Sequence, residues 1–377
     1  MRGLIYADNA ATTKLDIDAF EAMKPYLLEQ YGNASQPYTF SRSVKKALRQ
    51  SREIIASCIN VNPDEIYFTS GGTESDNWAI KGTSLVYGDT RPVLTSQIEH
   101  HAILNSCTAI ERLGFPVAYL RVTEKGVILP DTLDKYITPQ TKLVSIMLAN
   151  NEIGTIQPIS QLAAIAHKNG ALFHTDAVQA VGHIQVDVQK LGVDMLSASA
   201  HKFNGPKGIG FLYVRKGVNI HPLNDGGTQE SSMRAGTENV ASIVGMTVAL
   251  KKNCESIDVN TARLHELETL LITRLEQAQI EFIRNGDDNH IPGNISISIR
   301  GVEGEMLLHR LDLKGIYVST GAACNSGSTQ LSHVLSAINM PAEYAIGTIR
   351  ISLGRDNTKE DVISISDALI EILKQHE

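Results

Sequence analysis

Hydrophobic side chains follow two periods in turn along the first 240 residues of this 377-residue chain. Apolar positions three or four residues apart predict helices, whereas short apolar runs predict strands. The expected helices are 19–30, 43–59, one that opens at the turn 70–74 and runs to about residue 83, 103–113 and 159–169. The expected strands are 65–69, 92–96, 117–122, 143–148, 172–176, 195–198 and 210–215. This alternation is typical of an α/β fold with a mostly parallel sheet covered by helices on both faces.

The pattern changes after about residue 240, where longer helices and fewer strands follow. The expected helices are 243–252, 264–278, 303–311, 330–338 and 359–374, and the expected strands are 294–299, 315–319 and 348–353. A chain of this length exceeds what one hydrophobic core usually holds. We therefore predict a large domain at 14–255 and a smaller α+β domain built from 256–377 together with 1–13, whose strand joins from a distance.

Composition and charge narrow the class of protein. The formal net charge of −7 argues against a general nucleic-acid or membrane surface. Residues 1–8 lack the layout of a signal peptide, and no apolar run approaches the roughly 18–20 residues of a membrane span. The four cysteines are scattered without a CxxC pair, so we expect free thiols and a cytoplasmic location.

The segment 197–210 surrounds Lys202 with small residues and leads into a glycine-rich turn. Small side chains let a large ligand approach the backbone closely, and the hydroxyls of Ser197 and Ser199 can donate to a phosphate. A lysine in this setting suits a Schiff base, the usual way in which pyridoxal 5'-phosphate (PLP) is held. The alternative is an ordinary solvated lysine, which its surroundings disfavour.

Several polar residues follow expected strands, where open α/β sheets bind their ligands. Gly71, Gly72 and Thr73 open a helix and can cradle a phosphate, although a simple glycine turn is at least as common. Asp176 ends a strand and can pair with a pyridine nitrogen, or act as a cap. We expect the neighbouring His174 to be structural.

The segments 99–101 and 150–152 also follow expected strands. His100 can stack on a flat ring or shuttle protons. Neighbouring His101 raises the question of a metal, but no Cys/His/Asp cluster at metal spacing supports one. Asn150 and Asn151 carry amides that can contact a ring oxygen or a carboxylate, and turn chemistry explains them equally well.

The segment 319–328 places Cys324 among small and polar residues between a strand and a helix. We expect a loop whose thiol can collect a group in one site and deliver it elsewhere, once its pKa is lowered. Without Lys202, an incidental exposed cysteine would be the simpler reading. Arg350 lies on an alternating strand and can hold a carboxylate bidentately, or form a salt bridge between domains.

With these residues assembled, the chain resembles the NifS/IscS-like cysteine desulfurases, a PLP-dependent group within the class V aminotransferase family. The resemblance runs from residue 8 to residue 355. The motifs that carry it are DNAATT at 8–13, TSGGTESDN at 69–77, NNEIG at 150–154, HKFNGPKG at 201–208, MRAGTEN at 233–239 and the cysteine loop.

The resemblance implies the fold type I architecture of PLP-dependent transferases, with a mostly parallel sheet of seven strands, and a homodimer whose sites use both subunits. The catalytic residues would be Lys202 as the Schiff-base lysine, Cys324 as the sulfur acceptor and His100 stacked on the ring. The cofactor-binding residues would be Gly72, Thr73, His100, Asn151, Asp176, Gln179, Ser199, His201, Lys202 and, toward the partner subunit, Thr237. The substrate-binding residues would be Asn33, Asn151 and Arg350.

The resemblance also implies an activity, in which L-cysteine loses its sulfur to Cys324 as a persulfide and leaves as alanine. That sulfur would pass to an acceptor protein, either an iron–sulfur scaffold or a tRNA-thiolation enzyme. A selenocysteine lyase is an alternative, because selenium is the better leaving group. An aminotransferase has no need of the Cys324 thiol. A non-enzymatic scaffold conflicts with the joint presence of Lys202, Asp176 and Cys324.

The chain departs from the family pattern in two places. The family often has a histidine where this chain has Tyr38, in the segment GNASQPY at 32–38. Ser231 stands where an arginine usually follows Gln-Glu. These differences put the role of Asn33, the turnover rate and the preferred acceptor in question, and they leave the expected PLP core intact.

Overall fold

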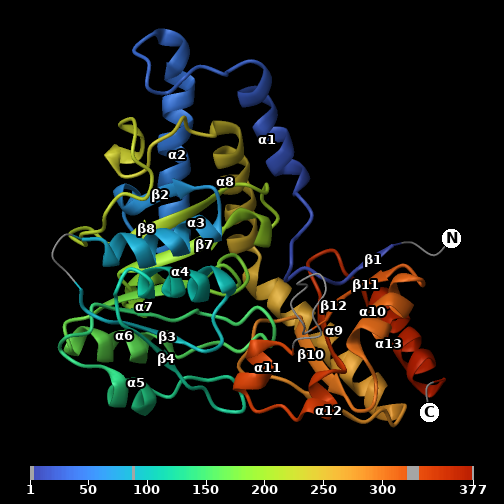
Figure 1. Ribbon diagram of the computed structural model, residues 1–377. Coiled ribbons are helices and arrows are strands. Elements are labelled where there is room, and N and C mark those ends of the chain that lie inside the picture. Colours follow the sequence, from blue (N-terminus) through green and yellow to red (C-terminus); the bar gives the residue numbers. More distant parts are fainter. Residues whose placement is uncertain (1–3, 87–89, 321–330, 376–377) are drawn as a thin grey trace.

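The computed structural model describes residues 4–86, 90–320 and 331–375. It contains a large seven-stranded sheet and a smaller four-stranded sheet, each covered by helices (Figure 1). In spatial order the large sheet consists of β2 (Ile66–Thr69), β8 (Gly210–Val214), β7 (Met195–Ser199), β6 (Leu172–Asp176), β5 (Leu143–Ser145), β3 (Val93–Ser96) and β4 (Val117–Leu120). Strand β8 is antiparallel to both of its neighbours and the other pairs are parallel. The prediction of a mostly parallel α/β sheet is therefore confirmed.

Helices cover both faces of this sheet. The bounds are α1 (Ile17–Leu28), α2 (Arg42–Ile59), α3 (Gly72–Asn77) continued by a π-helical turn (Trp78–Gly82), α4 (His101–Glu111), α5 (Pro130–Tyr136), α6 (Ile159–Lys168), α7 (Val188–Leu191) and α8 (Val240–Glu255). Val144 packs in the core beneath α2, α6 and α8, whereas its neighbour Leu143 packs in the core beneath the π-helical turn and α4. Successive strand side chains thus serve opposite faces, as expected of a doubly covered sheet.

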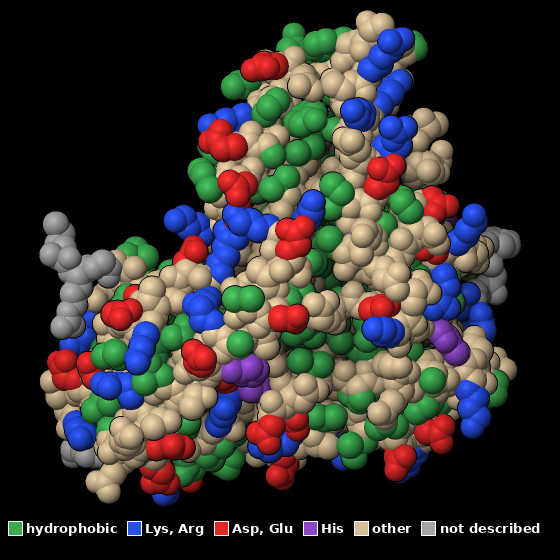
Figure 2. All heavy atoms as spheres, turned by 180° about the vertical axis from the view of Figure 1, so that it is seen from behind, with side chains coloured by type: hydrophobic (Ala, Val, Ile, Leu, Met, Phe, Trp, Pro, Cys, Tyr) green, Lys and Arg blue, Asp and Glu red, His purple; other side chains and the backbone are tan. Residues whose placement is uncertain are grey.

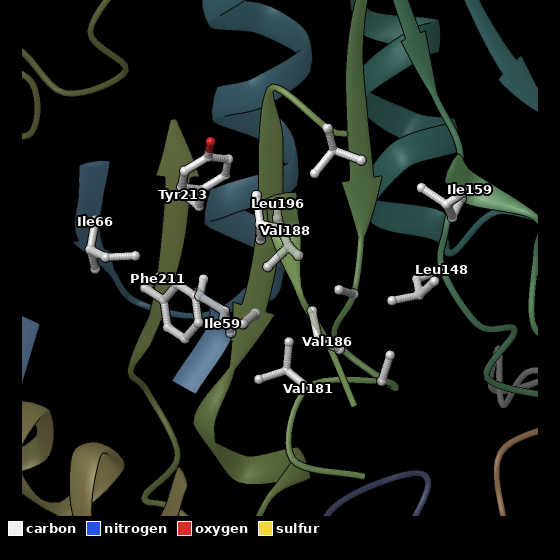
Figure 3. Close-up of a cluster of buried hydrophobic side chains, with 14 of the residues drawn as sticks. Ile59, Ile66, Leu148, Ile159, Val181, Val186, Val188, Leu196, Phe211 and Tyr213 are labelled. Atoms are coloured by element: carbon white, nitrogen blue, oxygen red, sulfur yellow. The ribbon is translucent and has the colours of Figure 1, made fainter. Parts of the chain in front are cut away.

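The larger of these two cores lies against one face of the sheet (Figure 3). Phe211 and Tyr213 of β8 and Leu196 of β7 share this core with Ile59 of α2, and each is at least 99% buried. Burying an aliphatic or aromatic side chain of this size stabilises the fold by roughly 1.5–3 kcal/mol. Strands β7 and β8 and helix α2 are therefore held together by side-chain packing.

The smaller sheet belongs to the C-terminal part of the chain. Its strands, in spatial order, are β12 (Ser319–Thr320), β13 (Thr348–Ser352), β10 (Asn294–Ile299) and β9 (Phe282–Arg284), all antiparallel. The associated helices are α9 (Ile257–Gln277), α10 (Gly304–Asp312), α11 (His333–Ala337), α12 (Ala342–Ala345) and α13 (Lys359–Lys374). A separate hydrophobic core lies between this sheet and α9, α10 and α13. The domain boundary at 255/256 stays a prediction; it falls in the single residue between α8 and α9.

The N-terminal strand joins this second unit from a distance, as the sequence predicts. Strand β1 (Ile5–Tyr6) pairs in parallel with β11 (Ile316–Tyr317), and the chain then rises into α1 beside the large sheet (Figure 1). The backbone N–H of Ser352 donates to the carbonyl of Ala7, which extends the contact toward β13. Residues 5–13 therefore run between the two sheets.

Charges are mixed over the face of the molecule seen in Figure 2, with several basic side chains grouped on its projecting end. Within the three described ranges, no helix combines the length and the apolarity that a membrane crossing requires.

Candidate active site

A cavity of about 500 Å³ opens at the carboxyl ends of the strands of the large sheet. Nine of the residues expected to bind a cofactor or substrate line it: Gly72, Thr73, His100, Asn151, Asp176, Gln179, Ser199, His201 and Lys202. They lie at or just after the ends of five strands, β2, β3, β5, β6 and β7, so the order of strands in the sheet brings them together.

Lys202 lies just beyond β7, at the end of a short 3-10 turn (Ala200–Lys202). Its Nζ donates hydrogen bonds to the carbonyls of Ala10 at 2.6 Å and Ala11 at 2.9 Å. Burial, and after it the charge of Arg350, lowers the pKa of Lys202 to about 8. An amine with this pKa is neutral in about one molecule in ten at pH 7, far more often than an ordinary lysine, and only the neutral form is a nucleophile.

The turn between β2 and α3 approaches this lysine with bare backbone. Gly71 has φ +148°, a conformation that residues with a side chain rarely adopt, and a Cβ on Gly72 would lie 2.6 Å from Cγ2 of Val178. The first backbone N–H groups of α3 and the Thr73 hydroxyl therefore face the cavity at a positive helix end. Ser199, at the end of β7, lines the same part of the cavity, since its Oγ is 3.4 Å from the Cβ position of Gly71. This arrangement suits a phosphate group.

Asp176 ends β6 and is 5% exposed. Its Oδ1 accepts a hydrogen bond from the N–H of Val178 at 2.9 Å, while burial raises the pKa of the carboxyl group. Asp76 of α3 lies nearby and is almost fully buried, and its pKa is raised by burial and by the charge of Asp176. Two buried carboxyl groups that repel each other in this way hold a single negative charge most easily.

His174 lies behind these carboxyl groups and is fully buried. Its ring nitrogens are each 2.9 Å from a serine hydroxyl, Ser145 at Nδ1 and Ser197 at Nε2. Burial lowers the pKa of His174 to about 3, so its ring is neutral. These contacts support the expectation that His174 has a structural role.

His100 is the N-cap of α4, and its Nδ1 accepts a hydrogen bond from the N–H of Ala102 at 3.1 Å. The ring proton of the neutral imidazole therefore lies on Nε2. Burial lowers the pKa of His100, and the nearby charge of Asp176 partly opposes this. The cap also fixes the ring orientation at the edge of the cavity.

Arg350 projects from β13 toward this site without lining the cavity itself. Its Nη1 donates to the carbonyl of Asn151 at 2.8 Å, and its Nη2 forms an ion pair with Oδ1 of Asp8 at 2.6 Å. The hydrogen bond to Asn151 links β13 to the wall of the cavity, and the role of Arg350 in binding a carboxylate stays a prediction. The neighbouring Asn150 serves the turn, because its Oδ1 accepts from the N–H groups of Glu152 and Ile153.

Besides Arg350, two expected site residues, Asn33 and Thr237, do not line the cavity. The Oδ1 of Asn33 accepts a hydrogen bond from the N–H of Ser35, and Asn33 does not line the cavity. Thr237 lines a second cavity of about 220 Å³, which shares Ser70 and Gly208 with the first. Cys324 lies outside the described residues, so its position stays a prediction.

Sequence reasoning missed some residues of the cavity wall, namely Ala11, Thr12, Ser70, Asp76, Met147, Val178 and Lys207. Asp76 was the one with a signal, because it follows Gly72 by four residues and therefore shares its helix face. Thr12 also contacts an expected site residue, since its Oγ1 lies 3.1 Å from Nδ1 of His201. Burial, followed by the charges of Lys202 and Lys207, lowers the pKa of His201 to about 4.

A partly buried lysine, a buried aspartate and a glycine turn at the strand ends are typical of a PLP-dependent enzyme. Comparison with known proteins agrees with this class. The chain belongs to the class-V aminotransferase family, whose sequence model matches residues 5–365. It is 50% identical over 377 residues to the cysteine desulfurase IscS of Dictyoglomus turgidum, covering all of this chain and 96% of that one.

Solved structures with a similar fold agree with this family. The structure titled "NIFS-LIKE PROTEIN" matches with a TM-score of 0.93 and 38% identity over 99% of this chain and 100% of that chain. The structure titled "SspA in complex with cysteine" matches with a TM-score of 0.82 and 35% identity over 93% of this chain and 98% of that chain. These likenesses confirm the expected fold class.

The residues present fit the PLP that this family implies. A phosphate matches the glycine turn, where Val178 leaves no room for a Cβ on Gly72. A protonated ring nitrogen matches the buried carboxyl group of Asp176, and an aldehyde matches the amine of Lys202, whose pKa is lowered. The donor set thus offers one partner for each functional part of the cofactor.

Proposed function

We propose that this chain is a PLP-dependent cysteine desulfurase that takes sulfur from L-cysteine and releases L-alanine. The observation that carries the proposal is the convergence of Lys202, Asp176 and His100 on one cavity. The cysteine desulfurase name of a relative 50% identical over the whole chain supports it, as does the likeness to a structure with bound cysteine.

The proposed roles of the residues follow from their surroundings. Lys202 holds the cofactor and, once free, takes the Cα proton of the substrate at Nζ. Asp176 keeps the ring nitrogen protonated, and bound PLP then supplies an electron sink for the substrate carbon. His100 is oriented by its cap to lie over the ring. Thr73, Ser199 and His201 hold the phosphate, Gln179 contacts the ring oxygen, and Thr237 reaches the phosphate of the partner subunit.

The substrate carboxylate is assigned to Arg350 and Asn151, with Asn33 as a further contact. The Nε of Arg350 is buried and has no hydrogen-bond partner among the described residues, which supports a free donor for this purpose. The thiolate of Cys324 then attacks the substrate sulfur. The carbon–sulfur bond breaks, its electron pair remains with the carbon skeleton, and Cys324 carries the persulfide.

The setting of the reaction is also part of the proposal. We place the protein in the cytoplasm, because Cys58, Cys107 and Cys254 are free thiols. A homodimer is supported by the second cavity around Thr237, which adjoins the first. The sulfur passes to an acceptor protein for iron–sulfur cluster assembly or tRNA thiolation.

The test is the release of sulfide and alanine from L-cysteine in the presence of a reductant. We expect wild type to release both products and Lys202→Ala to lose turnover together with the absorption band of lysine-bound PLP. Cys324→Ser should keep that band and lose protein-bound sulfur. Cys254→Ser, which changes a thiol outside the cavity, is the matched control and should behave like wild type.

Turnover by Lys202→Ala would contradict the assignment of Lys202 as the cofactor lysine. Persulfide formation by Cys324→Ser would contradict the assignment of Cys324 as the sulfur acceptor. Release of alanine from selenocysteine, with no release from cysteine, would favour a selenocysteine lyase.

A further inference from the structure

A second group of chemically active side chains lies far along the chain from the cavity. His265 and Glu268 are one turn apart on α9, and His290 belongs to the segment between β9 and β10. One imidazole nitrogen from each histidine and a carboxylate oxygen of Glu268 lie within 4.8 Å of one another. The spacing of these residues in the sequence gave no sign of this, because His290 reaches α9 only through the fold.

Glu268 is a buried carboxylate that the described residues satisfy incompletely. Its side chain is 4% exposed. Oε1 contacts Arg284 and lies 2.6 Å from Nε2 of His290. Oε2 is buried and has no hydrogen-bond partner among the described residues, and Nδ1 of His265 lies 3.5 Å from it. A buried carboxylate oxygen without a partner is costly, so this oxygen is available for a ligand.

The surroundings of His290 fix the orientation of its ring. Its Nδ1 lies 2.8 Å from the carbonyl of Asp288 and 3.1 Å from that of Asp287, so Nδ1 carries a proton and donates it. The other ring nitrogen, Nε2, is then the one directed at the carboxylate, 2.6 Å from Glu268 Oε1. A second ring nitrogen bonded to backbone carbonyls is the usual outer contact of a metal-binding histidine.

A cation already lies where these atoms converge. The Nη2 atom of Arg284 contacts Glu268 Oε1 and lies 2.9 Å from His290 Nε2. The side chain of Arg284 is 37% exposed, so its guanidinium can leave toward solvent without unfolding β9. The cluster of His265, Glu268 and His290 therefore favours a positive charge, and Arg284 would compete with a metal ion for the place between Glu268 and His290.

We propose that His265, Glu268 and His290 form a binding site for a divalent transition-metal ion of the Zn²⁺ class. Two imidazoles and one carboxylate are a ligand set that such ions take, with water in the fourth position. The 50% exposure of His265 leaves that fourth position open to solvent. The inference goes beyond the proposed desulfurase activity and does not depend on it.

The site would fasten α9 to a segment that contacts the large sheet's connections. The carbonyl of Asn289 accepts from the N–H of Ile156, and the N–H of Ile291 donates to the carbonyl of Gly154, both at 2.9 Å. These bonds hold the turn that carries Asn151. A bound ion would therefore stiffen the support of the active-site wall from the outside.

The experiment is a titration of chelator-treated, PLP-loaded protein with Co²⁺ as a spectroscopic probe and with Zn²⁺ by calorimetry. It uses a Cys324→Ser background, which removes the loop thiol as a competing ligand. We expect one ion per chain and a Co²⁺ spectrum without the charge-transfer band of thiolate ligands. His265→Ala and Glu268→Gln should each lower affinity by at least about tenfold. Arg284→Ala should raise it, because the competing cation is gone.

His309→Ala, which removes an exposed histidine from α10, is the matched control and should bind like the parent. His265 is also exposed, so its replacement leaves the fold intact and a loss of binding reports on the ligand itself. Unchanged affinity in His265→Ala, a thiolate band, or no stoichiometric binding by both the parent and Arg284→Ala would each overturn the proposal.

Discussion

The amine of Lys202 acquires its chemistry from its neighbours. Burial lowers its pKa first and the charge of Arg350 lowers it further, whereas Asp176 and Asp8 oppose the shift. The balance leaves the pKa at about 8, below the ordinary lysine value of about 10.4. The nitrogen is protonated below pH 8 and becomes a nucleophile above it.

Modification of cofactor-free protein by a small amine-specific reagent should reveal this shift. We expect the reaction at Lys202 to rise with pH with a midpoint near 8, because only the neutral amine reacts. Mass spectrometry of the peptides measures it, with exposed Lys190 as the internal reference. A midpoint near the ordinary value of about 10.4 would show that burial does not act as described.

Gly72 should tolerate no side chain while Val178 faces it. Gly72→Ala puts a Cβ 2.6 Å from Cγ2 of Val178, and overpacking of this kind costs about 1–3 kcal/mol. We expect the variant to bind PLP more weakly, as measured by cofactor absorbance in an equilibrium titration. The double variant Gly72→Ala/Val178→Ala should recover affinity because the clash is relieved. Equal weakness in both variants would place the defect in the turn backbone and contradict the steric account.

Residues in short motifs were predictable, and those that depend on distant contacts were not. Lys202 and Asp176 stand at strand ends that the hydrophobic pattern locates. Burial and then the charge of Asp176, one hundred residues later, raise the pKa of Asp76, and the pattern carries no information about that approach. Asn33 shows the opposite limit, because the resemblance gives it a role while its side chain accepts a hydrogen bond within a local turn.

At the scale of elements, the start of α1 is a junction between both sheets. Asp16 caps this helix by accepting from the N–H groups of Asp18 and Ala19. Its Oδ2 also pairs with Lys252 of α8 at 3.0 Å and with Arg355, after β13, at 2.6 Å. Burial opposes ionisation of Asp16, but these cations and the cap hold its pKa at about 2.

Acid should therefore weaken the fold through Asp16. Its folded pKa is below that of an unfolded aspartate, so its contribution is complete above about pH 5 and is lost as pH falls toward 2. Asp16→Asn keeps the cap and loses the ion pairs, so we expect a loss of about 1–2 kcal/mol at pH 7 that disappears in acid. Chemical denaturation at several pH values measures it.

Asp18→Asn is the matched control for this prediction. Asp18 also contacts Lys252 at 2.6 Å, but its side chain is 62% exposed, so its loss should cost at most about 0.5 kcal/mol. Asp16→Ala should cost about 1 kcal/mol more than Asp16→Asn, because the cap is lost as well. Equal effects of Asp16→Asn and Asp18→Asn would contradict a special role for the buried carboxylate.

Most long elements were predicted within a few residues, but α9 begins at Ile257, seven residues before the predicted start at 264. The apolar run 143–148 was predicted as one strand, yet β5 ends at Ser145. Met147 is buried against Val334 and Leu335 of α11 instead. An irregular segment that is buried on all sides has the same continuous run of apolar residues as a central strand. The short elements α5, α7, α12 and β9 were missed because each spans too few residues for a period to develop.

At the scale of the whole molecule, residues 5–13 connect both sheets to the site. The carbonyls of Ala10 and Ala11 accept from Lys202, and Gln179 also donates to Ala10. The phenolic O–H of Tyr6 lies at 3.0 Å from the carbonyl of Asp8 and 2.9 Å from that of Thr12, which keeps the segment folded back on itself.

A chain that starts at residue 14 should therefore lose the site and not only a strand. We expect it to bind PLP far more weakly than the full chain and to unfold the two sheets in separate transitions, as followed by cofactor absorbance and calorimetry. Tyr6→Phe removes one hydroxyl and should give an intermediate loss of affinity with a single transition. Full cofactor affinity in the shortened chain would show that residues 5–13 do not support the site.

The parallel pairing of β1 with β11 also sets an order of events during synthesis. Ile5 leaves the ribosome first, but its partner Ile316 is made more than 300 residues later. Contacts so distant along the chain form late, whereas the large sheet can assemble as soon as its strands emerge. The carbonyls that hold Lys202 would reach it only after nearly the whole polypeptide exists. A nascent chain would thus remain without a finished site until translation is almost complete, and a stalled fragment would have none.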